Sequence, residues 1–139
     1  MRLVTSTGTP PVRRDRRRVR RGSVSLSAHV LTEYAVGVLS IAAPFLFSFE
    51  ETSAKIVCVL VGVGILVLAV VTDAPTGIAR SLPVASHVVL DYVLGLFLIV
   101  APFVLAFSDD TAATAYFLVV GVGYVLLAVL TRYRDPKPA

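Results

Sequence analysis

The sequence is poor in the residues on which most catalytic chemistry depends. Its 139 residues include one cysteine, two histidines and no tryptophan. A single cysteine excludes an internal disulfide and dithiol chemistry within one chain, and two histidines are too few for a multi-histidine metal centre in one chain. The sequence also lacks the motifs of nucleotide-binding loops, zinc proteases and serine hydrolases. We therefore expect a protein that is not an enzyme and that carries no cofactor.

Charge is also scarce. Charged residues make up 16% of the chain and hydrophobic residues 56%, whereas about a quarter of the residues in a soluble domain are charged. A small soluble domain leaves much of its surface exposed, so it could not keep this much apolar surface away from water. The composition thus predicts an integral membrane protein.

Four apolar runs of 19 or 20 residues follow one another along the chain. An α-helix of that length, with a rise of about 1.5 Å per residue, spans a hydrocarbon layer of about 30 Å. Lipid offers no partner to an open backbone, so we predict four transmembrane α-helices. The runs are Val30–Phe49, Ala54–Thr72, Val88–Phe107 and Ala112–Thr131.

The connections between the runs indicate two helical hairpins. Residues 50–53 and 108–111 are short acidic turns, so each joins its two helices directly. The hairpins then occupy residues 29–72 and 87–131. Residues 73–86 contain two prolines and a glycine, which is typical of a linker. The predicted fold class is an all-α membrane protein with four transmembrane helices.

The basic residues gather on one side of this arrangement. Residues 1–28 carry eight arginines and one acidic residue, and like charges this dense favour disorder. This tail, the linker and residues 132–139 hold 12 of the 13 basic residues, so the positive-inside rule places all three in the cytoplasm, beneath the plasma membrane. We expect the arginine cluster to contact anionic lipid headgroups. It consists of Arg13, Arg14, Arg16, Arg17, Arg18, Arg20 and Arg21. Nucleic acid is not an expected partner, because no aromatic residue is interleaved with the arginines.

The two hairpins are copies of one another. Residues 29–49 align with residues 87–107, and nine of the 21 positions are identical. In the second helix of each copy the offset is 59, so that Gly62 falls on Gly121 and Thr72 on Thr131. Each copy holds two helices and enters from the same side, which predicts a parallel repeat about an axis along the membrane normal.

This repeated pattern resembles the SPW-repeat family of small membrane proteins. The resemblance rests on a glycine, five residues, then Ala-Pro-Phe, followed by a short turn and a glycine-rich second helix. The motif residues are Ala43, Pro44, Phe45, Ala101, Pro102 and Phe103, where the family has Ser-Pro-Trp. The resemblance covers residues 29–131 and implies the architecture, but it implies no biochemical activity.

Prolines and glycines inside the runs have structural and functional interpretations. Pro44 and Pro102 predict helix kinks; a fixed shape is the favoured interpretation and a hinge is the alternative. The glycines predict helix packing through small residues, with a ligand site as the alternative. They are Gly37, Gly62, Gly64, Gly95, Gly121 and Gly123.

Two histidine–carboxylate pairs are the candidate site residues. His29 precedes Glu33 by four residues, and His87 precedes Asp91 by four, so each pair shares a helix face. Brought together, the four side chains could ligate a metal ion or pass a proton. The simpler interpretation, favoured on sequence alone, is that both pairs lie at the headgroup level and bond locally.

These observations predict a non-enzymatic membrane protein that acts as a structural or interaction module and forms homo-oligomers. The alternative is a small transporter or channel for protons or metal ions that uses the two pairs at the cytoplasmic ends of the first and third helices.

Overall fold

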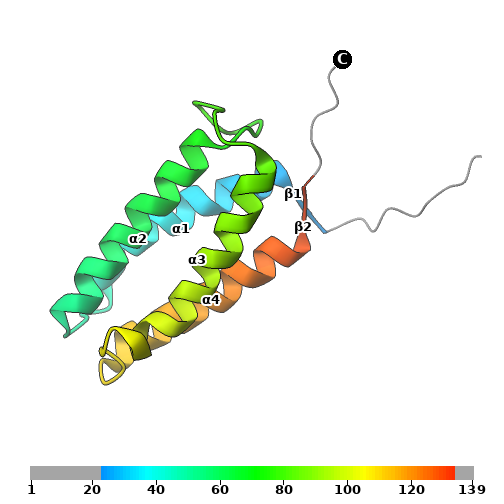
Figure 1. The fold of residues 1–139 in the computed structure, drawn as a ribbon. Helices are drawn as coiled ribbons and strands as arrows, with labels where there is room; N and C mark the ends of the chain where they lie inside the picture. The colour runs from blue at the N-terminus through cyan, green and yellow to red at the C-terminus, as the bar shows by residue number, and fades with distance from the viewer. Residues whose placement is uncertain (1–22, 134–139) are drawn as a thin grey trace, which may run out of the picture.

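A computed structural model describes residues 23–133. The arginine cluster and residues 134–139 therefore lie outside the described residues. Four helices make up most of the fold (Figure 1), and all four are long and apolar enough to cross a membrane, which confirms the predicted all-α, four-span class. They are α1 (Leu26–Leu46), α2 (Thr52–Val71), α3 (Val84–Val104) and α4 (Thr111–Leu130).

Helices α1 and α3 begin four residues earlier than their apolar runs predict. The Ser25 side chain caps α1 by accepting a hydrogen bond from the Ala28 N–H, and serine is among the preferred N-caps. Pro83 precedes the first residue of α3. Residues 24–28, which were predicted to belong to a disordered tail, are therefore strand and helix. As a consequence, His29 and His87 lie a turn inside their helices rather than at the ends.

Both prolines lie near the ends of their helices, where they shape the turn that follows. Pro44 is in the last turn of α1, and its carbonyl accepts the Phe49 N–H at 3.0 Å. Because proline has no N–H, the Ser40 carbonyl one turn back loses its helical donor. The thiol of Cys58 on α2 donates to that carbonyl at 3.2 Å, so the buried group is satisfied by a neighbouring helix.

Each hairpin packs closely through glycine. A Cβ added to Gly62 would lie 2.7 Å from the Gly37 carbonyl oxygen. Likewise, a Cβ on Gly121 would lie 3.0 Å from the Gly95 carbonyl oxygen. Small residues at such positions let two helix backbones approach one another. Gly64 and its repeat partner Gly123 differ, since no atom of residues 23–133 lies within 4 Å of their Cβ positions.

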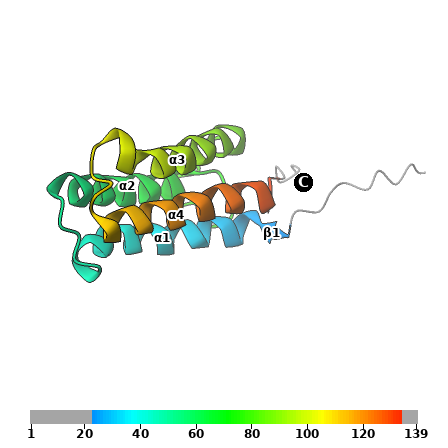
Figure 2. The same cartoon turned by 90° about the horizontal axis from the view of Figure 1, so that it is seen from below.

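The hairpins meet at both ends of the molecule. At one end, strand β1 (Val24–Ser25) pairs in parallel with β2 (Thr131–Arg132), beside the first turns of α1 and the last turns of α4 (Figures 1 and 2). At the other end, Asp110 caps α4 and also accepts the backbone N–H groups of Glu50 and Glu51. Between these ends, the Ser40 and Tyr116 hydroxyls lie 2.9 Å apart in a largely apolar core.

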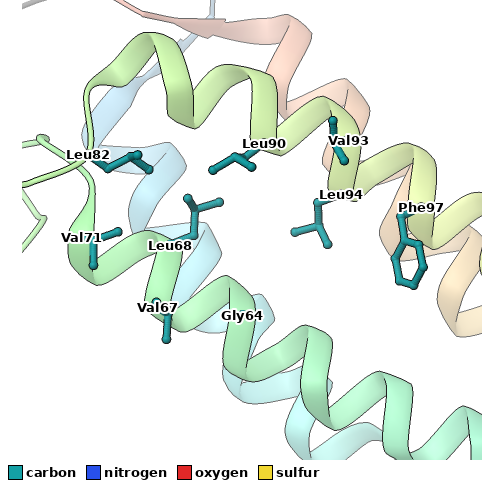
Figure 3. Close-up of a pocket in the computed structure, with 9 residues that line it drawn as sticks. All are labelled: Gly64, Val67, Leu68, Val71, Leu82, Leu90, Val93, Leu94 and Phe97. Atoms are coloured by element: carbon teal, nitrogen blue, oxygen red, sulfur yellow. The ribbon is translucent and has the colours of Figure 1, made fainter.

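An apolar groove of about 520 Å³ separates the hairpins on one face. Residues of α2 and α3 line its two sides, with Leu68 and Leu90 across from one another and Gly64 and Phe97 further along the two helices (Figure 3). None of the histidines or carboxylates of the candidate site lines this groove.

Candidate functional site

The four candidate residues come together at the end of the molecule where β1 and β2 pair. His29 and Glu33 extend from the first two turns of α1, and their repeat partners extend from the equivalent turns of α3. All four side chains are fully buried, and one ligand atom of each lies within 4.8 Å of those of the other three. We call this set, His29, Glu33, His87 and Asp91, the central cluster.

Each histidine is oriented by a threonine of the opposite hairpin. His29 Nδ1 lies 2.8 Å from the hydroxyl of Thr131, which follows α4. His87 Nδ1 lies 2.7 Å from the hydroxyl of Thr72, which follows α2. The two bonds are related by the repeat, so the same pair of residue types ties the hairpins together twice.

The threonine bonds determine which ring nitrogen faces the centre. Each threonine hydroxyl has one hydrogen, and it goes to a carbonyl four residues back, at Leu68 or Leu127, over 2.6 Å. The hydroxyl oxygen must then accept from the histidine, so Nδ1 carries the proton of a neutral ring. The Nε2 lone pairs of His29 and His87 consequently face one another, 3.3 Å apart.

The carboxylates complete a ring of acceptors around the centre. Asp91 Oδ2 lies 3.1 Å from His29 Nε2 and 3.3 Å from His87 Nε2. Glu33 Oε1 lies 3.6 Å and 3.5 Å from the same two atoms. Two ionised carboxylates beside two neutral rings would be costly to bury, so the site needs a positive charge, either a proton on a histidine or a bound cation.

Two tyrosines donate to the carboxylates. The Tyr124 hydroxyl of α4 donates to Glu33 Oε1 at 2.7 Å. The Tyr133 hydroxyl, beyond β2, donates to Asp91 Oδ2 at 3.1 Å. Burial, and then the Asp91 carboxylate, raise the pKa of Tyr133 above its ordinary value, so its phenol keeps the proton it donates. The tyrosines hold the carboxylates in place but do not neutralise them.

The second oxygen of each carboxylate is also unsatisfied. Glu33 Oε2 and Asp91 Oδ1 are buried and have no hydrogen-bond partner among residues 23–133. Within the same residues, no lysine or arginine nitrogen lies within 4.0 Å of either carboxylate. The two histidines are therefore the only basic side chains beside these two carboxylates among residues 23–133.

The structure differs from the simpler interpretation of the two pairs. Local pairing at the headgroup level would leave each histidine with its own carboxylate, whereas each histidine contacts both carboxylates and a threonine of the other hairpin. Sequence reasoning did not identify the threonines or the tyrosines as site residues. The alignment of Thr72 with Thr131 in the repeat was the available signal, but Tyr124 and Tyr133 align with Ile65 and Ala74 and gave none.

The fold and the cluster define a class: a multi-pass membrane protein built from a duplicated helical hairpin, with a buried polar site between the copies. The comparison with protein families identifies it further, since the SPW repeat domain matches residues 27–131. The chain belongs to the SPW repeat family. The comparisons with curated proteins and with solved structures found no match.

Proposed function

We propose that this membrane protein binds one divalent metal ion in the central cluster, between its two hairpins. The observation that carries the proposal is the convergence of two imidazole nitrogens and two carboxylate oxygens, all from fully buried side chains and all within 4.8 Å of one another. A dication would balance the two carboxylate charges and accept both Nε2 lone pairs. Metal-bound histidines commonly donate their other N–H to a fixed acceptor, as both histidines do here. This proposal departs from the expectation that the chain carries no cofactor.

We also propose that the protein is not an enzyme. The Thr–His pairs superficially resemble a nucleophile and a base, but each threonine hydrogen is donated to a carbonyl and not to the ring. The central cluster is fully buried, so a substrate has no access to the ring nitrogens. An ion that holds the hairpins together fits a structural or interaction module.

The alternative function is transport of a metal ion or proton through the same cluster. Buried carboxylates within membrane helices support it, because such residues commonly mark ion pathways. The core between the cluster and the acidic turns weighs against it, since Leu98, Phe107 and Phe117 are among the buried side chains that fill this region. The resident-ion proposal therefore has the stronger support.

The proposal also covers the orientation of the protein in the membrane and its partners. Arg80 and Arg132 lie at the end of the central cluster, whereas Lys55 lies near the opposite, acidic turns. We place the cluster at the cytoplasmic end of a plasma-membrane protein, with both termini inside. The arginine cluster then lies beside anionic headgroups, and a second copy of the chain remains the proposed protein partner.

The test is the metal content of the full-length chain, purified in detergent and measured by elemental analysis. We expect about one divalent ion per chain, and loss of that ion in the isosteric Glu33→Gln, Asp91→Asn double variant. The matched control is Glu50→Gln with Asp109→Asn, which changes one exposed residue of each type at the other end. A chain that is metal-free after incubation with divalent cations would overturn the proposal. Cation flux into proteoliposomes that the double variant abolishes would favour the transport alternative.

A further inference from the structure

The distances between the ligand atoms of the central cluster indicate which metal ion it accepts. This inference rests on the proposed function. Five of the six distances between its ligand atoms are 3.1, 3.3, 3.3, 3.5 and 3.6 Å. A zinc-type ion binds nitrogen and oxygen ligands at about 2.0–2.2 Å, so the edges of its tetrahedron measure about 3.3–3.6 Å. Four of the five distances fall in this range, and the His29–Asp91 distance of 3.1 Å is slightly shorter.

Other geometries do not match the same distances. A square-planar site has two long diagonals, and five short edges among four atoms leave room for one at most. Calcium takes six to eight oxygen ligands and magnesium an octahedron rich in water. The cluster instead offers two nitrogens and two oxygens, with all four side chains fully buried.

We infer that the central cluster is a closed tetrahedral site for a late d-block dication of the zinc type, with all four ligands supplied by the protein. Four protein ligands without an open position are typical of structural zinc sites, whereas catalytic sites keep a water-filled position. His29 and Glu33 come from one hairpin and His87 and Asp91 from the other, so the ion joins the two copies of the repeat.

Thr72 and Thr131 are positioning residues for this ion. Their hydroxyls fix the Nδ1–H form of each histidine and so present Nε2 to the centre. Removing an outer partner of a metal-bound histidine typically weakens binding about 10–100-fold. A serine at either position keeps the hydroxyl and should keep the metal affinity. A valine keeps the shape of threonine but lacks the hydroxyl, so it should weaken metal binding.

The experiment uses the full-length chain in detergent, stripped with a chelator and titrated with Co²⁺ as a spectroscopic probe. We expect one Co²⁺ per chain with the intense visible absorption of a tetrahedral complex, displaced by Zn²⁺ but not by a large excess of Mg²⁺ or Ca²⁺. A weak octahedral spectrum, or displacement by Mg²⁺ or Ca²⁺, would overturn this inference and leave the proposed function standing. If none of these ions binds, the proposed function itself fails.

The threonine variants provide the second arm. Thr72→Val and Thr131→Val should each weaken Co²⁺ binding about 10–100-fold, and the serine variants should recover it. The control is Thr32→Val, because the Thr32 hydroxyl makes the same bond to a carbonyl four residues back but is exposed and touches no ligand. Equal affinity in the valine variants and the control would show that the threonines do not position the histidines.

Discussion

At the scale of single residues, one glycine in the second helix of each hairpin faces the backbone of the first helix. Gly62 and Gly121 occupy positions where a Cβ would meet the neighbouring helix at 2.7–3.0 Å. Gly64 is two residues further along the same helix and has open space around its Cβ position. The two neighbouring glycines therefore allow a matched comparison of packing against conformational freedom.

We expect Gly62→Ala to destabilise the protein by about 1–3 kcal/mol, because the added methyl group meets a carbonyl that can move only with its helix. Gly64→Ala should be neutral, or stabilising by up to about 1 kcal/mol, because alanine restricts the unfolded chain. Reversible unfolding in mixed micelles measures both. Equal losses would contradict the intrachain contact, and a loss at Gly64 alone would indicate that this face packs against a second copy.

At the scale of elements, the turns between helices join the hairpins at the end opposite the central cluster. The Asp110 carboxylate accepts three backbone N–H groups, one in its own helix and two at the turn before α2. Burial would raise the pKa of Asp110, but the N–H groups of Ala113, Glu51 and Glu50 outweigh it and hold the pKa below its ordinary value. The ionised form is therefore the one that the fold stabilises.

The free energy of unfolding should therefore depend on pH. A carboxylate with a lowered folded pKa contributes stability in full above its unfolded value, about 3.9 for aspartate, and loses it as the pH falls through the folded value. We expect unfolding measured between pH 6 and about pH 2 to show this loss, and Asp110→Asn to flatten it. Asp109→Asn, at an exposed neighbouring position, is the control. An unchanged pH profile in Asp110→Asn would refute the role given to this carboxylate.

The elements themselves could largely be predicted from the sequence, because the length of an apolar run determines whether a helix can cross a bilayer. The ends of α1 and α3 could not, since a capping serine at residue 25 and prolines at 83 and 102 shift them without changing hydropathy. Of the site, the histidine–carboxylate pairs could be predicted, because a spacing of four residues puts both side chains on one helix face. The threonine contacts could not, because only the packing of α4 against α1 brings Thr131 to His29.

At the scale of the whole molecule, duplication accounts for both the fold and the central cluster. One hairpin supplies a histidine and a carboxylate, which are half of the ligands of the proposed tetrahedral site. It also supplies one of the two threonines that orient the histidines. A second copy, entering from the same side, supplies the other half across the pseudo-twofold axis. The symmetry is incomplete, because the carboxylates differ in length and receive their tyrosine bonds from different elements. The site therefore depends on both copies, and its side of the membrane follows from that of the termini.

The side of the membrane on which the central cluster lies can be tested by cysteine labelling. In a Cys58→Ala background, single cysteines replace Ser23, Thr52, Ser81 and Asp109, all of which are exposed. An impermeant thiol reagent should label positions 52 and 109 in intact cells, and positions 23 and 81 only after permeabilisation, because 12 of the 13 basic residues lie on the side of the termini and the linker. The reverse pattern would place the central cluster at the outer face, where its ion would equilibrate with the external medium. Labelling of 23 and 52 from the same side would instead contradict the passage of α1 through the membrane.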